Sequence, residues 1–477
     1  MSADPEGERR VLARIAERLP TTIEEVRAAI RQPSVSATGE GVEAMAAWVR
    51  DYLAACGAEA GLARIDGAPI VEGELAAGGG IRPRLLFYEL YDVQPAAGQR
   101  GWSVDPFAAE IVTAADGRRR LVGRGAFNSK GPLVAALAVF RCFRDAGVEL
   151  PVDLRFLIEG EEEIGSPSLA PYIARNRAAL AACDAAFIPY FGTSSRGDTI
   201  LRLGFKGLVL LELSVTGGAW GGPARGDVHA LHGAAFASPS WQLVRALASL
   251  VDADERLHAG VLGAMIPPPS DADRALVAAA ARDFDVDAYR RELGLERFKG
   301  AGTADDVLQA LMFDCTVNID ALAAGSIPPD GDPPTVVPRV ARAFLDLRLL
   351  PGMDPQAAVA ALRRHLDDRG FAHVDLRVRS AYPASRATVG EPVVKALVEA
   401  ARAEAPKLIV LPIHAGAAPM HVFTEMIGIP YAFGGVGHGA GSHGPDEYIL
   451  VDDVAPFMRT VARFLFRFAE RRTARPP

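Results

Sequence analysis

The sequence lacks a long uninterrupted apolar run. Charged residues or glycines interrupt every apolar stretch well before the ~20 residues that a membrane-spanning helix needs. Residues 1–10 carry acidic and basic side chains in turn and no apolar core, which is not the pattern of a secretory signal. Basic residues form no block and the net charge is −8, which argues against nucleic acid as a partner. We therefore expect a cytoplasmic protein with neither a membrane nor a nucleic-acid partner.

Cysteine is also scarce. The chain has four cysteines, and they lie far apart without the spacing of a metal site: Cys56, Cys142, Cys183 and Cys315. Unpaired, buried thiols in a reducing compartment are the expectation for such a pattern.

What the chain does have is the composition of a globular protein. Hydrophobic residues make up 49% of the sequence and charged residues 23%, which are ordinary values. Its 477 residues exceed the size at which one hydrophobic core stops growing. We therefore expect at least two domains.

The first part of the chain alternates helical and strand-like patterns. Apolar spacing predicts helices over 8–31, 41–56 and 131–146, and buried strands over 84–88 and 152–158. This alternation indicates an α/β layer architecture around a largely parallel sheet. The loops that follow the two strands lie at the carboxyl ends of those strands, where ligands bind in such sheets.

The middle of the chain has a different pattern of apolar residues. It predicts a strand over 208–216, a helix over 235–251, a strand pair within 334–351 and a helix over 354–367. This order indicates a small α+β insertion near 204–381. After residue 395 the helix and strand pattern returns, and a final helix follows residue 451.

Polar motifs follow the predicted strands of the first part. They read FYELYDVQPA (87–96), LVGRGAFNSKG (121–131) and LIEGEEEIGS (157–166). Three further segments stand apart from them along the chain: DVHALHGAAFASP (227–239), FLDLRLLPGMDP (344–355) and GSHGPDEYI (441–449).

In their order and spacing, these segments resemble those of the dinuclear metallopeptidase family that includes carnosinase, aminoacylase and succinyl-diaminopimelate desuccinylase. The resemblance covers about residues 10 to 470. It implies a phosphorylase/hydrolase-like mixed-sheet catalytic domain formed by 1–203 and 382–477. It also implies an inserted α+β, ferredoxin-like lid and dimerisation domain over 204–381, and hence a homodimer.

The resemblance implies two metal ions that share a water molecule, but most of the matching ligand positions have changed. Leu90 stands at the first histidine and Asn128 at the bridging aspartate. The later aspartate falls on Tyr190, or on Pro189 if the register slips. Because leucine offers no donor and an amide is a poor bridging ligand, we expect one metal position to be empty.

The remaining matches keep their chemistry. The resemblance makes Glu162 the general base and Glu163 and His443 metal ligands, while Asp92 normally orients the first histidine. Two ligands and the amide of Asn128 would hold at most one weakly bound divalent cation, zinc or manganese. The expected cofactor is therefore none, or that single cation.

The insertion carries further matches. Arg348 corresponds to a lid arginine that grips a substrate carboxylate, and His229 to a lid histidine that stabilises the oxyanion in the partner's active site. The substrate loop around Gly416 reads AGAA (415–418), without the usual hydroxyl. We include Asn128, Tyr190 and Gly416 among the candidate substrate-binding residues. Alternatively, Arg348 is a strand-surface charge and His229 a surface histidine, since its segment is one residue short.

Three functional hypotheses follow. The first is an enzyme that acts on an amino-acid- or peptide-like molecule through Glu162, Asp92 and His229 without a dinuclear centre. It would catalyse condensation, cyclisation, isomerisation, elimination or acyl transfer, chemistry suited to biosynthesis. The second is a single-metal amide or dipeptide hydrolase that uses Glu163 and His443. The third is a non-catalytic protein that binds such a ligand or regulates an active relative.

Overall fold

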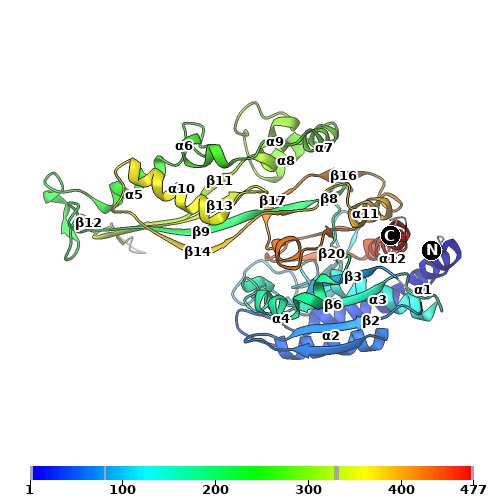
Figure 1. The fold of residues 1–477 in the computed structure, drawn as a ribbon. Coiled ribbons are helices and arrows are strands. Elements are labelled where there is room, and N and C mark those ends of the chain that lie inside the picture. Colours follow the sequence, from blue (N-terminus) through cyan, green and yellow to red (C-terminus); the bar gives the residue numbers. More distant parts are fainter. Residues whose placement is uncertain (1–3, 80–81, 327–331, 474–477) are drawn as a thin grey trace. The chain divides into compact units, whose positions relative to one another are not determined.

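The computed structural model describes residues 4–79, 82–326 and 332–473 (Figure 1). The chain forms two compact units. The first unit comprises Met1–Leu203, Ala387–Leu411 and Val422–Pro477; the second comprises Gly204–Arg386 and Pro412–His421. The sequence-based division ended the insertion at 381 and kept 412–421 with the catalytic part. The catalytic and lid roles of the two parts stay predictions.

The first unit is built on a mixed six-stranded sheet in the order β1-β2-β6-β3-β7-β18. Neighbouring pairs from β6 to β18 are parallel, whereas β1 and β2 join the edge antiparallel. The strands are β1 (Glu59–Ala63), β2 (Ile70–Leu75), β3 (Arg84–Leu90), β6 (Asp153–Glu159), β7 (Ala185–Ile188) and β18 (Tyr431–Phe433). The α/β architecture is therefore confirmed, with a more mixed sheet than the alternation predicted.

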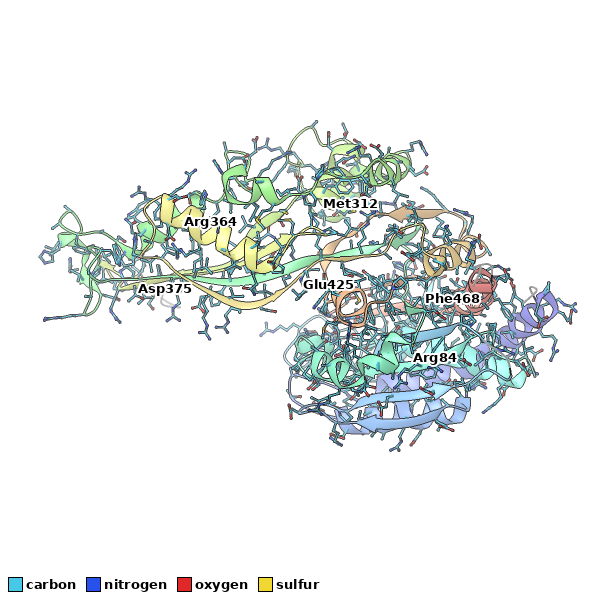
Figure 2. The ribbon with its side chains drawn as sticks, in the orientation of Figure 1. Arg84, Met312, Arg364, Asp375, Glu425 and Phe468 are labelled. Atoms are coloured by element: carbon cyan, nitrogen blue, oxygen red, sulfur yellow. The ribbon has the colours of Figure 1, made fainter. Side chains whose placement is uncertain are left out.

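Helices pack on this sheet through aromatic side chains. Phe87 of β3 contacts Phe140 of α3 with ring centroids 5.6 Å apart, and Phe187 of β7 stacks on Phe464 of α12 at 4.0 Å. The helices of the unit are α1 (Pro5–Arg31), α2 (Val42–Cys56), α3 (Lys130–Asp145), α4 (Leu169–Ala181), α11 (Pro392–Arg402) and α12 (Val454–Thr473). Figure 2 adds the side chains, including Arg84 at the start of β3 and Phe468 on α12.

Smaller sheets complete the first unit. An antiparallel sheet has the order β19-β20-β5-β4, and β16 pairs with β8 in parallel. Their bounds are β4 (Glu110–Thr113), β5 (Arg119–Val122), β8 (Thr199–Arg202), β16 (Leu408–Leu411), β19 (Gly439–Ala440) and β20 (Tyr448–Leu450). The first of these sheets holds the ends of two segments that carry site residues, 121–131 and 441–449.

The second unit contains a sheet in the order β11-β13-β9-β14, with α5 and α10 in the connections. This βαββαβ order is ferredoxin-like, as the resemblance implied. The strands are β9 (Gly204–Thr216), β11 (Thr316–Ala324), β13 (Val340–Leu349) and β14 (Asp375–Tyr382); β15 (Ser385–Arg386) and β17 (His414–Ala417) also pair with β9. The helices are α5 (Pro239–Ala248), α6 (Ala259–Leu262), α7 (Asp271–Ala281), α8 (Val286–Glu292), α9 (Ala304–Phe313) and α10 (Pro355–Asp368).

Strand alternation decides which face of this sheet is buried. Val209, Leu211 and Leu213 of β9 belong to the core together with Leu345 and Leu347 of β13. The intervening positions point to the other face, because successive side chains of a strand alternate. That second face carries Arg348 and Asp346, which are treated below.

Two details of the sequence-based prediction were wrong. The segment 334–351 does not form a strand pair: β12 (Val336–Val337) pairs with β10 (Val228–His229), while β13 lies between β11 and β9. The helix predicted over 235–251 is shorter, because Ser238 caps α5 and Pro239 starts it. By contrast, the cysteines are free and buried, as predicted. Among the described residues, no helix has the length and apolar character needed to cross a membrane.

Candidate active site

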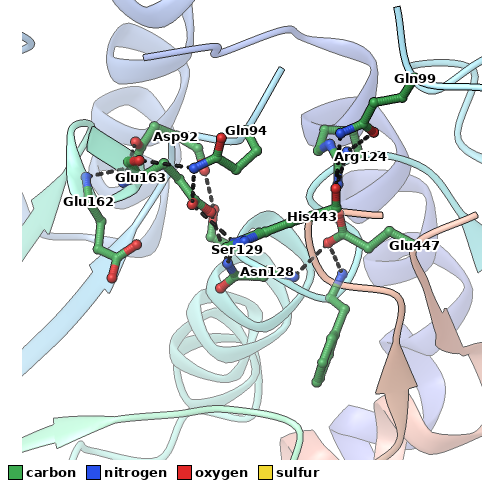
Figure 3. Close-up of polar contacts among 11 residues, drawn as sticks. Asp92, Gln94, Gln99, Arg124, Asn128, Ser129, Glu162, Glu163, His443 and Glu447 are labelled. Atoms are coloured by element: carbon green, nitrogen blue, oxygen red, sulfur yellow. Dashed lines mark hydrogen bonds and ion pairs between the residues drawn. The ribbon is translucent and has the colours of Figure 1, made fainter. Parts of the chain in front are cut away.

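The acidic turn after β6 is held by the loop after β3. Asp92 accepts hydrogen bonds from the backbone amides of Glu162 (3.2 Å) and Glu163 (3.0 Å), one on each carboxylate oxygen (Figure 3). Its side chain is fully buried. Because both oxygens face these amides, Asp92 positions the two glutamates; a catalytic role for Asp92 stays a prediction.

Glu163 is the centre of a hydrogen-bonded cluster (Figure 3). Nδ2 of Asn128 donates to Oε1 of Glu163 at 2.9 Å, and Nε2 of Gln94 donates to Oε2 at 3.0 Å. Nε2 of His443 lies 3.1 Å from both Oε2 of Glu163 and Nδ2 of Asn128. The hydrogen bond to Glu163 raises the pKa of His443, which favours the imidazolium. Both carboxylate oxygens of Glu163 are therefore hydrogen-bonded by donors of the protein itself.

The backbone of His443 is fixed in an unusual conformation. Its φ is 63°, in the left-handed region that non-glycine residues seldom occupy. Its carbonyl oxygen accepts hydrogen bonds from Gln99 (3.0 Å) and from Arg124 (3.2 Å). Arg124 in turn forms a fully buried ion pair with Glu447 at 2.8 Å. Glu447 also accepts a hydrogen bond from the backbone amide of Asn128 at 2.7 Å. The buried ion pair therefore holds both His443 and Asn128 in place.

The three consecutive glutamates have different environments. Glu161 is buried, and its carboxylate accepts hydrogen bonds from the backbone amides of Ala68 and Ser168, so it stabilises the turn. Among the described residues, the side chain of Glu162 has no hydrogen-bond partner, and Figure 3 shows its carboxylate without any of the marked contacts. Burial, followed by the charge of Glu163, raises the pKa of Glu162 to about 8.

Other buried titratable groups surround the turn. Burial raises the pKa of Glu159 to about 8 and that of Asp92 to about 6. Glu159 accepts a hydrogen bond from the hydroxyl of Tyr88. Lys130 is fully buried, donates to the carbonyl of Gln32 and has its pKa lowered to about 7 by burial. Burial thus disfavours the charged forms of Glu159, Asp92 and Lys130.

Leu90 and Tyr190 stand at two positions that the resemblance assigns to the ligands of one metal ion. Leu90 ends β3 and is hydrocarbon. Tyr190 packs between the rings of Phe127 (4.9 Å between centroids) and Phe433 (5.2 Å), and its hydroxyl hydrogen-bonds to Ser442. The predicted role of Tyr190 in substrate binding stays a prediction.

The contacts of His438 lie outside this cluster. His438 is buried, and its ring nitrogens lie 2.8 Å from the carbonyl of Thr193 and 3.1 Å from the hydroxyl of Tyr448. Within 4–79, 82–326 and 332–473, no group of three or more His, Cys, Asp or Glu side chains is arranged to hold a metal ion. Asn128 turns its amide hydrogens toward Glu163, and the loss of the dinuclear centre stays a prediction.

The remaining candidates belong to the second unit. Arg348 lies on β13, partly buried, with its Nε 2.8 Å from Asp346. His229 ends β10 and is exposed, and its Nδ1 accepts the amide of Leu231. The amide of Gly416 donates to Nδ1 of His414 at 2.7 Å. The predicted roles of Arg348, His229 and Gly416 in binding and catalysis stay predictions.

Some members of the site were absent from the predicted set. Gln94, Gln99 and Glu447 hold Glu163, His443 and Asn128 in place. Each lies within or just beyond one of the motif segments. Closeness in sequence to Asp92 or His443 was therefore the one feature that could have suggested these residues as members of the site. Nothing in the sequence showed which partner each side chain would contact.

The fold of the chain is shared with solved metallopeptidases. A metallo-carboxypeptidase from Sulfolobus solfataricus superposes with a TM-score of 0.83 at 29% identity, over 94% of this chain and 99% of that chain. Human carnosine dipeptidase 1 superposes with a TM-score of 0.76 at 21% identity, over 97% of this chain and 100% of that chain. The second likeness shows the fold alone.

Sequence comparison gives the family. The model of peptidase family M20/M25/M40 matches residues 86–467, so the chain belongs to this family. The Beta-Ala-His dipeptidase of Rattus norvegicus is 27% identical over 288 residues, which are 60% of this chain and 55% of that protein. The Cys-Gly metallodipeptidase of Saccharomyces cerevisiae is 26% identical over 288 residues, 59% of this chain and 56% of that protein. The matches thus span about half the length of these relatives.

Proposed function

We propose that the chain is an enzyme that acts on an amino-acid- or peptide-like molecule through acid–base chemistry at Glu162, without a dinuclear metal centre. One observation carries this proposal: Asn128 and His443 contact the carboxylate of Glu163, while that of Glu162 has no partner among the described residues. Because Asn128, Glu163 and His443 contact one another, the carboxylate of the adjacent Glu162 is the functional group left free to act on a ligand.

The arrangement around Glu162 suits proton transfer. Asp92 fixes the backbone of Glu162, so the point from which its side chain projects is set before a ligand arrives. The imidazole of His443 lies beside Glu163, where it can stabilise negative charge that develops on a ligand. Condensation, cyclisation, isomerisation, elimination and acyl transfer all need such a positioned acid or base.

The names of the relatives support the class of ligand. Two of them are named as dipeptidases, one for Beta-Ala-His and one for Cys-Gly. We propose that the ligand of this chain is likewise a dipeptide or an amino-acid derivative of similar size. His229, Tyr190 and Gly416 stay candidates for its contacts, and the chemistry would suit a biosynthetic step.

The test uses protein purified without added metal and treated exhaustively with a chelator. Dipeptides, N-acyl amino acids and pairs of free amino acids are screened for any conversion by mass spectrometry. Glu162→Gln should abolish conversion while ligand affinity, measured by calorimetry, is retained. Glu110→Gln, at an exposed position of β4, is the control and should keep full activity.

Two outcomes would overturn the proposal. Activity that disappears with chelation and returns with zinc or manganese would mean hydrolysis at a metal held by Glu163 and His443. Binding without any conversion, in both the native chain and Glu162→Gln, would mean a non-catalytic binding protein.

We also propose that the chain forms a homodimer in the cytoplasm. The edge strand β11 is mostly exposed and carries Ile319 and Leu322, whose side chains are 54% and 53% exposed. An exposed apolar edge strand is a surface that pairs readily with a second chain. The four unpaired, buried cysteines agree with a reducing compartment.

A further inference from the structure

The main sheet of the first unit carries apolar side chains at the carboxyl ends of its strands, next to the acidic turn. Four of its strands run in the order β6-β3-β7-β18, and each neighbouring pair is parallel. Leu90 ends β3 and pairs with Glu159, the last residue of β6. Glu162 follows Glu159 by three residues. Leu90 therefore lies beside the start of the acidic turn.

The pairing of β3 with β7 determines what lies on the other side of Leu90. Phe87 pairs with Phe187 in these parallel strands. Continuing that register by three residues brings Tyr190 level with Leu90. The ring of Tyr190 stacks on that of Phe433, the last residue of β18, with centroids 5.2 Å apart and an angle of 25° between the planes. Leu90, Tyr190 and Phe433 thus follow one another across the ends of three adjacent strands.

Two chain neighbours connect these side chains with the hydrogen-bonded cluster. Phe127 directly precedes Asn128, and the centroid of its ring lies 4.9 Å from that of Tyr190. The hydroxyl of Tyr190 hydrogen-bonds to Ser442, which directly precedes His443. These apolar side chains therefore adjoin both the acidic turn and the cluster. We call them the apolar edge: Leu90, Phe127, Tyr190 and Phe433.

Solvent exposure of the apolar side chains begins at the apolar edge. The four side chains of the edge are only partly buried. The apolar residues that precede them in the three strands are each at most 3% exposed: Phe87, Tyr88, Phe187, Ile188, Tyr431 and Ala432. An accessible apolar surface at the carboxyl ends of parallel strands lies where ligands bind in sheets of this kind.

The apolar edge offers little to a charged group. Leu90, Phe127 and Phe433 have no polar side-chain atom, and the hydroxyl of Tyr190 already bonds to Ser442. A charged side chain placed there would lose its hydration without gaining a partner, whereas an apolar side chain would leave water for a hydrocarbon surface. The chemistry of the edge therefore favours one kind of occupant, a large apolar side chain.

We propose that the apolar edge is a subsite that receives a large apolar side chain of the ligand, such as that of leucine or phenylalanine. This inference rests on the proposed function for the class of ligand, a dipeptide or a similar amino-acid derivative. It does not depend on the reaction. The chain should accordingly select ligands with a large apolar residue over those with alanine or glutamate in the same place.

The test compares dipeptides that differ in one side chain: alanyl-leucine, leucyl-alanine, alanyl-glutamate, glutamyl-alanine and alanyl-alanine. Their dissociation constants are measured by calorimetry on Glu162→Gln with a chelator present, so that neither turnover nor stray metal interferes. One of the leucine probes should bind about ten- to hundredfold more tightly than alanyl-alanine, the gain from burying most of a leucine side chain. Neither glutamate probe should show this gain.

Two substitutions of Leu90, made in the same background, separate a subsite from an effect on folding. Leu90→Asn keeps the size of the side chain but makes it polar, and should remove most of the preference for leucine over alanine. Leu90→Met stays apolar and should retain the preference. Ile111→Asn, at an exposed position of β4, is the control and should also retain it. Because each preference is a ratio of two affinities in one variant, a general loss of stability cannot imitate the expected result.

The outcomes distinguish this inference from the proposed function. Equal affinities for the leucine probes and alanyl-alanine, or a glutamate probe that binds as tightly as the leucine probe, would overturn the subsite even if Glu162 proves catalytic. An unchanged preference in Leu90→Asn, or no binding of any probe at millimolar concentration, would overturn it too. A preference for leucine that Leu90→Asn removes supports the subsite, even if the native chain converts none of the probes.

Discussion

Nδ2 of Asn128 lies 2.9 Å from Oε1 of Glu163 and donates a hydrogen bond to it. An aspartate at position 128 would instead bring two carboxylates to this distance, an arrangement that requires a cation or a shared proton. The amide thus satisfies by a hydrogen bond a carboxylate oxygen of a residue to which the resemblance assigns a metal ion.

Asn128→Asp should reverse this relationship. Loss of the donor and repulsion from Glu163 should lower the free energy of unfolding of the metal-free protein by about 1.5–3 kcal/mol, the value of a hydrogen bond to a charged group. Zinc or manganese should restore stability, because binding to the folded state stabilises it. Thermal denaturation with and without metal measures both effects. Asn176→Asp, on α4, is the control: it loses one hydrogen bond to a neutral carbonyl, so its stability should fall less and should not respond to metal. A variant that is as stable as the native chain and insensitive to metal would contradict this account.

Glu447 should be among the most sensitive positions of the site. Its ion pair with Arg124 is 2.8 Å long and fully buried. Glu447→Ala would leave a buried guanidinium unpaired, which costs about 3–5 kcal/mol. The matched control is Asp452→Ala, because the pair of Asp452 with Arg119 is exposed and exposed pairs contribute about 1 kcal/mol or less. Urea denaturation measures both variants, and equal losses of stability would refute the assignment.

Glu159 should make stability depend on pH. Burial raises its pKa from 4.5 to about 8, so the folded chain keeps a proton that the unfolded chain releases between these values. The contribution of Glu159 to stability is therefore full below pH 4.5 and is lost as the pH rises through about 8. Glu159→Gln cannot lose this proton, so its free energy of unfolding should fall less steeply over that range. Denaturation series at several pH values compare the two slopes, with Glu110→Gln as control. Identical slopes for Glu159→Gln and the native chain would rule out this role.

The homodimer gives a further prediction. Static light scattering should report twice the mass of one chain for the native protein. Leu322→Glu places a charge on the exposed edge strand β11 and should shift the mass toward one chain, because burying that charge at an interface is unfavourable. Val389→Glu, at an exposed position of the first unit, should leave the mass unchanged. A monomeric native protein would contradict the proposed dimer.

Local patterns predicted much of the fold. Apolar spacing located α1 and α3 to within a few residues of their observed ends, and the run at 152–158 lies one residue from β6. The pairing of strands was harder, because alternation in β13 says which face is buried but not which strand lies beside it. For that reason the segment 334–351 was wrongly predicted to pair with itself.

The site was predictable in part. The segments 87–96, 121–131 and 157–166 come together at the acidic turn, and Asn128, Glu163 and His443 do meet. The sequence could not show that Asn128 donates to Glu163, or that Arg124 and Gln99 hold the carbonyl of His443. The contacts of the His443 carbonyl join residues more than 300 positions apart, and all three contacts depend on the backbone conformation.

Metal content tests most directly whether the chain works without a dinuclear centre. Plasma mass spectrometry would be applied to protein purified without a chelator or a metal-affinity tag, with zinc and manganese titrations alongside. We predict at most one weakly held equivalent of metal per chain, lost in Glu163→Ala and His443→Ala. Two tightly bound equivalents per chain would contradict it, since they would show that other residues rebuild the metal site.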